Sequence, residues 1–403
     1  MKPVFRIAAL LCAAVFALSG CGSMGFDESF VFPEAGANYL SDERVEEGET
    51  LGVGKKPSKM ISMTSAELVS TIRIGWNIGK SLDVCCGDFD GNWRVDAKPE
   101  EGESVSETLW GNPLVTRELF KGLTDSGINA VRIPVTWRDH TDEEGNIDPE
   151  WLNRVQQVVN YAYNCGLYVI INMQHDGAKD TDFGAWIPNA ATDYDTVVKR
   201  FRRIWEQVAE RFENYNERLL FESMNEVKFP CNDVSRAFEL QNALNAEFVD
   251  VIRAGGGNNP RRHIIIAGVE GKIQKTLDER FVVPNDPAAR IIVSVHSYFA
   301  RNALMGSSLY EWGTEEQKAK LAELVSALKT RFVDKGIPVI IDECGTEKTT
   351  DEGDVTYCRT LLELCRENGM ACFVWDDGRR YDRENYVWDN PELISALNDV
   401  ALN

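Results

Sequence analysis

Short apolar runs alternate with amphipathic stretches along most of the chain, from about residue 65 onward. The apolar runs are nearly continuous and rich in β-branched residues, as is typical of strands that are buried on both faces. They predict eight strands, over residues 72–77, 130–134, 168–172, 219–223, 263–267, 291–296, 338–342 and 372–375.

The stretches between these strands repeat their apolar positions at helical spacing. They predict helices over residues 115–125, 150–164, 194–211, 235–253, 315–331, 355–367 and 391–401, with a less regular pattern over 272–281. A glycine stands between a predicted helix and the next strand at Gly127, Gly166, Gly336 and Gly369. Glycine is common at this position because it adopts the left-handed backbone conformation that ends many helices.

Eight strands alternating with helices predict a single-domain α/β protein, a closed (β/α)8 TIM barrel over residues 61–403. A doubly wound sheet has the same alternation of elements. The barrel is favoured because polar and aromatic residues follow the strands at their carboxyl ends, where barrel enzymes build their active sites. These residues are Asn77, Arg132, His175, Asn225, Glu226, His296, Glu343 and Trp375.

The first residues predict an export signal. Lys2 and Arg6 begin a basic start, and the apolar run over residues 7–18 is too short to span a bilayer as a helix. Leu18-Ser19-Gly20-Cys21 then resembles a bacterial lipobox, in which cleavage precedes a lipidated cysteine. We therefore expect a lipoprotein signal peptide (1–20), lipidation of Cys21 and an irregular tether (21–60). The alternative is an ordinary secretory signal with a chance cysteine.

Charge and composition limit the classes of partner that the protein could bind. The formal net charge is −21, so nucleic acid and anionic membrane surfaces should be repelled, whereas a neutral polysaccharide is compatible with it. No Cys-x-x-Cys pair or Cys/His cluster is present, and the chain has only 4 His, so no metal site is predicted. Eight cysteines follow Cys21, and their pairing stays open. We expect a monomer that is tethered to the cell envelope by its lipid, on the periplasmic or surface face of an outer membrane.

Two of the predicted strands end in a glutamate. The fourth runs from Leu219 into Asn225-Glu226, and the seventh runs from Val339 into Asp342-Glu343. In a barrel both carboxylates would face one site. Glycoside hydrolysis needs two such groups, one protonated to donate to the leaving oxygen and one ionised to attack or support the anomeric carbon.

Several short motifs in this order resemble glycoside hydrolase family 5, closest to its endo-β-1,4-glucanases and xyloglucanases. They are Gly75-Trp76-Asn77-Ile78-Gly79, Trp110-Gly111-Asn112-Pro113, Arg132-Ile133-Pro134-Val135-Thr136-Trp137, Asn225-Glu226, His296-Ser297-Tyr298, Asp342-Glu343-Cys344-Gly345 and Trp375-Asp376-Asp377-Gly378. The resemblance implies a retaining endo-acting hydrolase of a β-1,4-glucan, such as cellulose oligomers, mixed-linkage glucan or xyloglucan. Glu226 would be the acid/base and Glu343 the nucleophile, at roughly 5–5.5 Å, and no cofactor would be needed.

The same resemblance implies supporting roles. Asn225 would hydrogen-bond the sugar 2-hydroxyl, Arg132 and Tyr298 would keep Glu343 ionised, and His296 would line the same subsite. Trp375 would offer a flat apolar face to a sugar ring. His140 resembles a substrate-contacting histidine of these enzymes. Further tryptophans near loops predict either glycan platforms or buried loop anchors, and these are Trp137, Trp186, Trp312 and Trp388.

Two positions depart from the family pattern. The third strand ends in Gln174-His175 where relatives usually have two histidines, and Lys80 stands where they tend to have asparagine. Gln174 keeps hydrogen-bonding capacity but cannot be protonated. Two alternatives therefore stay open: a β-mannanase or other β-glycanase on the same barrel, and a catalytically weak, lipid-anchored glycan-binding protein.

Overall fold

The structure is a computed structural model that describes residues 57–86, 104–177, 184–299, 312–346 and 350–402. The predicted signal peptide, Cys21 and most of the predicted tether lie outside these residues. Ser58 already contacts the barrel, since its backbone N–H donates to Asn214 (2.9 Å) and its carbonyl accepts from the side chain of Asn258 (2.9 Å). The folded part therefore begins before residue 61.

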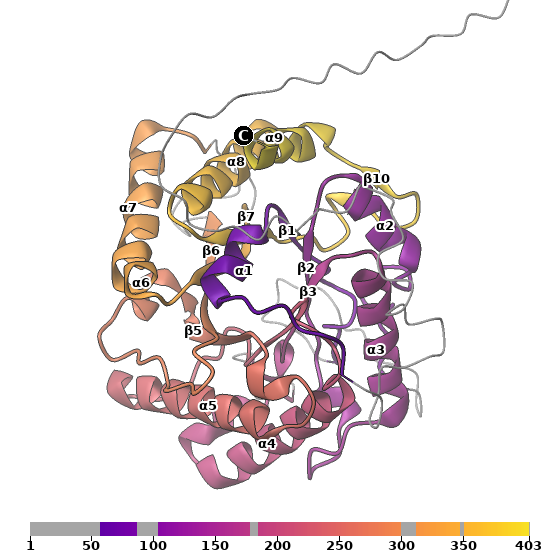
Figure 1. Cartoon of the computed structure of the whole chain (residues 1–403), viewed down its shortest axis with the longest axis vertical. Coiled ribbons are helices and arrows are strands. Elements are labelled where there is room, and N and C mark those ends of the chain that lie inside the picture. Colours follow the sequence, from indigo (N-terminus) through magenta and orange to yellow (C-terminus); the bar gives the residue numbers. More distant parts are fainter. Residues whose placement is uncertain (1–56, 87–103, 178–183, 300–311, 347–349, 403) are drawn as a thin grey trace, which may run out of the picture. The chain divides into compact units, whose positions relative to one another are not determined.

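Eight parallel strands form a closed barrel in sequential order, from β1 beside β2 round to β8 beside β1 (Figure 1). The predicted barrel is confirmed. The strands are β1 (Gly75–Asn77), β2 (Ala130–Ile133), β3 (Tyr168–Ile171), β4 (Leu219–Glu222), β5 (Ile264–Lys272), β6 (Ile291–Phe299), β7 (Val339–Thr346) and β8 (Ala371–Val374). Register is regular between β2 and β3 but shifts between β5 and β6, β6 and β7, and β7 and β8.

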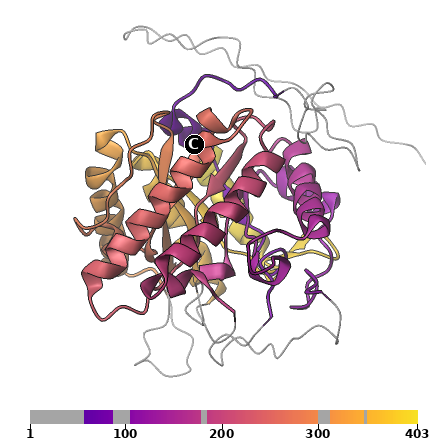
Figure 2. The same ribbon diagram turned by 90° about the horizontal axis from the view of Figure 1, so that it is seen from below.

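Helices surround the strands in Figures 1 and 2. They are α2 (Arg117–Asp125), α3 (Pro149–Asn164), α4 (Tyr194–Arg211), α5 (Val234–Ala254), α6 (Ile273–Thr276), α7 (Glu315–Arg331), α8 (Asp351–Glu367) and α9 (Pro391–Leu402). Side-chain caps set several starts: Thr314 and Gln317 form a capping box at α7, and Asp148 caps α3 just before Pro149. Each of the four predicted helix-ending glycines has a positive φ.

Three elements were not predicted from the pattern. Helix α1 (Ser65–Thr71) begins at a capping box of Thr64 and Glu67, and the two-stranded hairpin β9 (Tyr381–Asp382) and β10 (Val387–Trp388) follows β8. Helix α6 has only four residues, far fewer than the stretch 272–281 suggested. Segments this short carry too few apolar positions to establish a period.

Helix α1 closes the amino-terminal end of the barrel. Leu68 and Val69 pack with inward-facing residues of seven strands: Ala130, Ile170, Leu220, Ile265, Ile292, Ile340 and Phe373. This apolar layer fills the barrel interior, so the barrel is a packed core rather than a channel. Figure 2 shows α1 at one end of the strands, and the carboxyl ends of the strands lie at the other.

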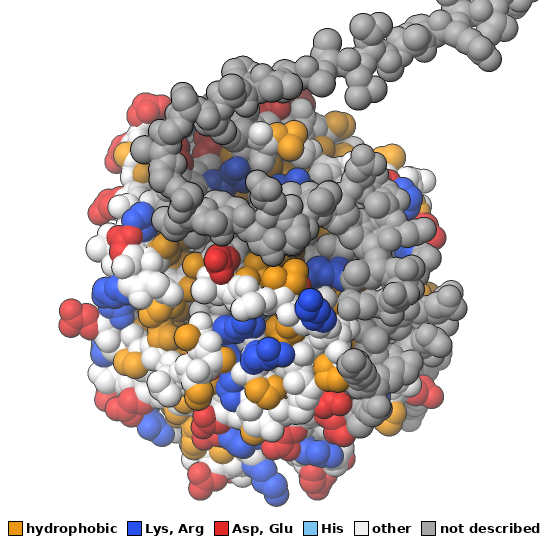
Figure 3. All heavy atoms as spheres, viewed as in Figure 1, with side chains coloured by type: hydrophobic (Ala, Val, Ile, Leu, Met, Phe, Trp, Pro, Cys, Tyr) orange, Lys and Arg blue, Asp and Glu red, His pale blue; other side chains and the backbone are white. Residues whose placement is uncertain are grey.

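The described surface carries side chains of both charges. Figure 3 shows acidic and basic side chains mixed over the face on which α1 lies, with small apolar areas between them. Among the described helices, none is long and apolar enough to cross a membrane. No disulfide bond joins any of the eight cysteines in the described part of the chain.

Candidate active site

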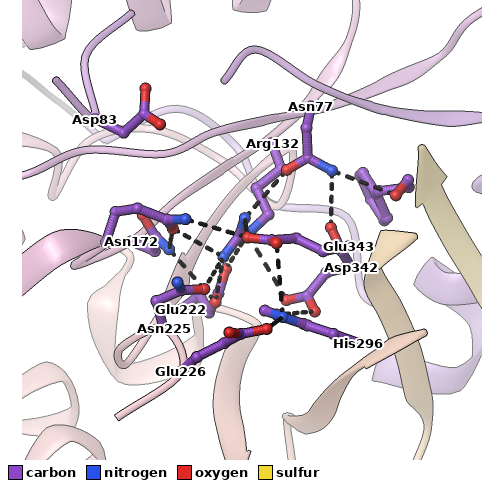
Figure 4. A network of polar contacts seen from close by, with 12 residues as sticks. Asn77, Asp83, Arg132, Asn172, Glu222, Asn225, Glu226, His296, Asp342 and Glu343 are labelled. Atoms are coloured by element: carbon purple, nitrogen blue, oxygen red, sulfur yellow. Dashed lines mark hydrogen bonds and ion pairs between the residues drawn. The ribbon is translucent and has the colours of Figure 1, made fainter. Parts of the chain in front are cut away.

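A layer of polar side chains lies next to the apolar layer inside the barrel. Because alternate strand residues face inward, the residue two positions after each apolar one also points into the barrel. On β2, β4 and β7 these residues are Arg132, Glu222 and Asp342, and all three are completely buried. Hydrogen bonds and ion pairs connect them, through Arg132 and His296, to the glutamates at the strand ends, as Figure 4 shows.

Arg132 is the centre of this network. Its Nε and Nη2 donate to the two carboxylate oxygens of Glu222 (2.6 and 2.9 Å), and its Nη1 donates to Glu343 Oε1 (2.6 Å). Burial alone would lower the pKa of Arg132, but Glu222 and Glu343 raise it well above its ordinary value. The remaining donor contacts hold three side-chain oxygens at 3.1 Å, those of Asn77, Gln174 and Asn225. Arg132 is therefore a permanent cation that fixes several side chains at once.

Glu343 is held on both carboxylate oxygens. Gln174 Nε2 donates to Oε1 (3.1 Å) beside Arg132, and the hydroxyl of Tyr298 donates to Oε2 (3.0 Å). Burial would raise the pKa of Glu343, but the positive charges of His296 and Arg132, with the hydrogen bonds, lower it to about 2. Burial and the nearby negative charge raise the pKa of Tyr298 well above its ordinary value, so it stays a donor. Glu343 is thus an ionised, oriented carboxylate.

Glu226 has different surroundings. Its side chain is 46% exposed, and His296 Nδ1 lies 2.5 Å from its Oε1. His296 Nδ1 also lies 3.6 Å from Glu343 Oε2, and its Nε2 lies 3.4 Å from Asp342. Burial would lower the pKa of His296, but Glu343 and Glu226 raise it well above its ordinary value. His296 therefore carries a positive charge between the two glutamates.

The two glutamates lie close together. One oxygen of Glu226, one of Glu343 and a ring nitrogen of His296 all lie within 4.8 Å of one another. A separation of about 5–5.5 Å between carboxyl groups is typical of retaining glycosidases, whereas inverting ones need roughly 6.5–9.5 Å. The same three atoms are the one group in the described residues that could hold a metal ion. The positive charges of Arg132 and His296 already balance these carboxylates, and the predicted lack of a metal stays a prediction.

Gln174 lies in the network, not beside it. Besides donating to Glu343, its Oε1 accepts from Arg132 (3.1 Å) and from Asn172 (2.6 Å). Its three hydrogen bonds need both a donor and an acceptor, which the neutral amide supplies without titrating. The departure from the usual histidine therefore preserves the hydrogen bonding of Glu343.

Lys80, the second departure, lies at the rim of the site. It adopts a positive φ of 53°, and its Nζ pairs with Asp377 (2.9 Å). Asparagine tolerates this backbone conformation better than lysine, which is a physical reason to expect it at this position. Lys80 contributes a charge that Asp377 neutralises.

Three further predicted residues are placed near the network. Asn77 is buried and donates to the carbonyl of Asp342 (2.9 Å) while accepting from Arg132, so it orients the network from β1. His175 is half-buried, with Nε2 3.7 Å from Asp83 and its ring 5.6 Å from that of Trp110. Trp375 is half-buried, and its indole lies directly against Gly79.

The structure corrects one predicted substrate contact, His140, and decides the open alternative for Trp137. His140, in the short 3-10 helix Arg138–His140, is 5% exposed and stacks on Trp151 of α3 with ring centroids 3.7 Å apart. Trp137 is completely buried, and its indole N–H donates to the carbonyl of Asn172 (2.9 Å). Neither side chain is accessible to a polysaccharide. Both anchor the segment after β2.

Two of the other three loop tryptophans are also buried anchors. Trp186 is 6% exposed and donates to Asp176 (2.7 Å), while Trp312 is 6% exposed and packs on Tyr357. Trp388 of β10 packs edge-on against Trp76 and is half-buried. Burial decides the open alternative in favour of anchors for Trp137, Trp186 and Trp312, whereas for half-buried Trp388 it stays open.

Four site residues were missed as candidates. Glu222, Asp342, Asn172 and Ser294 face the barrel interior two positions after an apolar residue. That spacing is visible in the sequence as a polar residue near the end of an apolar strand. Ser294 donates to Asp342 Oδ1 (2.7 Å), which holds the carboxylate beside His296.

The fold and these residues define a class of protein. A closed (β/α)8 barrel with an oriented anionic carboxylate and a solvent-accessible partner carboxylate at one end is the arrangement of retaining glycoside hydrolases.

Comparisons with known proteins specify the family. Residues 95–380 match cellulase (glycosyl hydrolase family 5), and the chain belongs to this family. Endoglucanase A of Ruminococcus albus is 34% identical over 363 residues, which cover 84% of this chain and 93% of the relative. Cellulase/esterase CelE of Acetivibrio thermocellus is 32% identical over 97% of this chain, but the chain spans only 47% of that protein.

Solved structures agree with these relatives. The family 5 glycoside hydrolase of Prevotella bryantii B14 in complex with a xyloglucan tetradecasaccharide is 31% identical, with a TM-score of 0.74, over 85% of this chain and 100% of the other. The family 5 lichenase of Caldicellulosiruptor sp. F32 in complex with cellotetraose is 30% identical, with a TM-score of 0.72, over 86% and 97% of the two chains. The protein is therefore a cellulase-like glycoside hydrolase.

Proposed function

We propose that the protein cleaves internal β-1,4 bonds of a glucan by double displacement, with Glu343 as nucleophile and Glu226 as acid/base. The observation that carries this assignment is the contrast between the two carboxylates. Glu343 is buried and accepts hydrogen bonds on both oxygens, whereas the side chain of Glu226 is 46% exposed and has one close partner, His296.

The proposed reaction has two steps. In the first, protonated Glu226 donates its proton to the glycosidic oxygen as a carboxylate oxygen of Glu343 attacks the anomeric carbon, so the glycosidic bond breaks and a glycosyl ester forms. In the second, ionised Glu226 takes a proton from water, and the water oxygen displaces Glu343 from the anomeric carbon. The exposure of Glu226 supports this proposal, because both the leaving sugar and the water must reach it.

Arg132, Tyr298 and Gln174 are proposed to orient Glu343 and to keep it ionised. Asn225 is held by Arg132 at the end of β4, next to Glu226, and we assign it the hydrogen bond to the sugar 2-hydroxyl. Trp375, half-buried against Gly79, is assigned the apolar face for a sugar ring. The polar network is complete despite Gln174, which argues against a protein that only binds glycan.

The proposed substrates are linear or branched β-1,4-glucans, in line with relatives named endoglucanase, lichenase and xyloglucanase. Sizing the products from cellulose oligomers, mixed-linkage glucan, xyloglucan, mannan and xylan tests this. A mixture of short oligomers from one or more of the glucans is expected. Release of a single small product would contradict endo action, and preferential cleavage of mannan would favour the alternative β-mannanase.

The assignment of residues is tested by trapping. A 2-deoxy-2-fluoro cellobioside with an activated leaving group should form a stable ester, and peptide mass spectrometry should locate it on Glu343. Proton NMR of the first product should show retention of the β-anomer. A label on another residue would overturn the assignment, and an α-anomer as the first product would overturn the retaining mechanism.

We also propose that the chain is exported, cleaved before Cys21 and lipidated there, so that it is anchored to the cell envelope. The support is the pattern of Lys2, Arg6, the apolar run and Leu18-Ser19-Gly20-Cys21. Expression in a bacterial host with radioactive palmitate should label the protein, and Cys21→Ser should abolish the label. Labelling of Cys21→Ser would show that this cysteine is not the lipidation site, and an unlabelled, secreted wild type would favour an ordinary secretory signal.

A further inference from the structure

Strand β5 leaves the barrel ladder just beside the two glutamates. Ala267 is paired with Ser294 of β6, and Lys272 is paired with His296. Between these pairs β6 advances by two residues and β5 by five, so the β5 segment 268–271 contains three residues more than the ladder can pair. The additional residues bulge out of the ladder, and β5 rejoins β6 at the residue that binds Glu226.

The bulge contains two consecutive residues in the left-handed region. Glu270 has a φ of 53° and Gly271 a φ of 64°. Left-handed backbone is unfavourable for a residue with a side chain, so Glu270 needs compensating contacts. Its carboxylate accepts from Lys272 Nζ (3.0 Å) and Lys275 Nζ (2.5 Å). These ion pairs close the turn on its outer side.

Hydrogen bonds to Thr276 of α6 hold the turn over residues 268–271. The backbone N–H of Val269 donates to Thr276 Oγ1 (3.1 Å), and this hydroxyl donates to the carbonyl of Lys272 (2.9 Å). Thr276 is completely buried. The turn is therefore attached to its own connecting helix and keeps its shape independently of the glutamates.

Gly271 faces the acid/base pair at very short range. A Cβ on Gly271 would lie 2.9 Å from His296 Nδ1 and 3.0 Å from Glu226 Cγ. Contacts this short do not occur between real side chains, so the backbone of residue 271 already packs directly on both residues. His296 Nδ1 is the atom that binds Glu226. A methyl group at residue 271 would enter the space where these two side chains meet.

We infer that Gly271 is a positioning residue for the acid/base Glu226. The backbone of the β5 bulge packs against Glu226 and His296 and thereby determines where these two side chains meet. This inference rests on the proposed role of Glu226. Glu226 has little else to locate it, because its side chain is largely exposed and His296 is its close polar partner. Glu343 is held by Arg132 of β2, Gln174 after β3 and Tyr298 of β6. None of these three donors is among the atoms nearest to a Cβ at Gly271.

The test compares Gly271→Ala with Gly336→Ala. Gly336 has a similar φ of 80° and nothing within 4 Å of a Cβ, so its substitution adds the same kind of backbone strain without a contact at the site. Thermal unfolding of both variants controls for folding. Activity is measured on a series of aryl β-cellobiosides whose leaving phenols range from poor to very good, with and without azide.

Gly271→Ala should lower kcat/KM for phenyl β-cellobioside and for glucan by about 10²-fold or more, since loss of general acid catalysis typically costs 10²–10⁴-fold. The dinitrophenyl substrate needs no proton donor, so its kcat/KM should change less than about threefold, and azide should accelerate its turnover. Gly336→Ala should show no dependence on the leaving group. Equal losses on all substrates, or no loss on any, would overturn the inference.

Glu270→Gln is a milder second variant, which keeps the size of the side chain and weakens its ion pairs with Lys272 and Lys275. It should show the same dependence on the leaving group with a loss of a few-fold, and a loss that is equal on all substrates would contradict the inference.

Trapping with the fluoro sugar distinguishes failure of this inference from failure of the proposed function. If Gly271→Ala is labelled on Glu343 as fast as wild type but shows no leaving-group effect, only the inference about Gly271 fails. If wild type is not labelled on Glu343, the proposed function itself fails.

Discussion

Glu343 and Glu226 lie at the same end of the barrel within 4.8 Å of each other, yet they are held in opposite ways. The side chain of Glu343 is 7% exposed, and three side chains donate hydrogen bonds to it. The side chain of Glu226 is 46% exposed, and His296 is its close partner. The barrel therefore fixes one carboxylate firmly and leaves the other accessible.

This difference follows from what each group has to do. A nucleophile needs one protonation state and one orientation, which buried cations and donors supply. An acid/base has to lose and regain a proton in every cycle, so it cannot be surrounded by permanent cations to the same extent. His296 lies close to both glutamates and keeps its positive charge, so a change of charge on one glutamate is felt by the other.

The largest effect is expected from Glu343→Gln. The amide keeps the shape of the side chain but cannot form the glycosyl ester, so kcat on glucan should fall on the order of 10⁴–10⁶-fold, as when other covalent nucleophiles are removed. Rates on soluble β-glucan and on an aryl β-cellobioside measure the loss. Glu323→Gln makes the same chemical change on the exposed surface of α7 and should keep full activity. A Glu343→Gln variant as active as wild type would refute the role of Glu343.

A smaller and substrate-dependent effect is expected from Glu226→Gln. Glucan hydrolysis should fall by about 10²–10⁴-fold, because proton donation to the leaving oxygen is lost. With a dinitrophenyl leaving group the first step should be nearly unchanged, so a burst of phenol should precede slow turnover, and azide should restore turnover. Equal losses of activity in both variants on every substrate would refute the different roles assigned to the two glutamates.

Gln174→Ala should have a moderate effect, since it removes one donor to Glu343 and an acceptor for Arg132. A hydrogen bond to a charged group contributes about 1.5–3 kcal/mol, so kcat/KM should fall by about 10- to 100-fold. Gln174→His restores a donor and should recover part of the activity. A change of less than twofold in Gln174→Ala would show that Arg132 and Tyr298 alone orient Glu343.

Gln174→His should also change the pH dependence of kcat/KM. An imidazole ordinarily titrates near a pKa of about 6.5, so it would add positive charge beside Glu343 below that pH and lose it as the pH rises. The variant should show an additional inflection in kcat/KM between roughly pH 5 and 7 that wild type lacks. A profile identical to that of wild type would mean that the new histidine does not titrate in this range.

The sequence predicted the barrel and the glutamate pair because each strand is a compact apolar run with a polar residue at its carboxyl end. Glu226 and Glu343 stand after the apolar part of their strands, where a change of polarity is easy to see. Arg132 was found because it is the one charged residue in the apolar run 130–134. Glu222 and Asp342 lie deeper inside the barrel. Their roles could not be predicted, because they depend on which side chains face the barrel interior and contact Arg132.

Contacts between distant segments could not be predicted. His140 and Trp151 are 11 positions apart in sequence, and only the packing of α3 brings their rings together. The bulge at Glu270 and Gly271 has no signal in the apolar pattern, because it depends on the pairing of β5 with β6. Loop tryptophans look alike in a sequence whether they are exposed or buried, and only the fold shows that Trp137 is enclosed.

The smallest effect on activity is expected from His140→Phe, since a residue that touches neither glutamate should not alter either of them. Phenylalanine keeps the stacking on Trp151 and removes the buried ring nitrogen that has no partner. Activity on glucan should stay within about twofold of wild type, whereas His140→Ala should lower the free energy of unfolding by about 0.5–1.5 kcal/mol or more through loss of the stacked pair. Denaturant unfolding and kcat/KM measure the two effects. A tenfold rise in KM for His140→Phe with unchanged stability would restore His140 as a substrate contact.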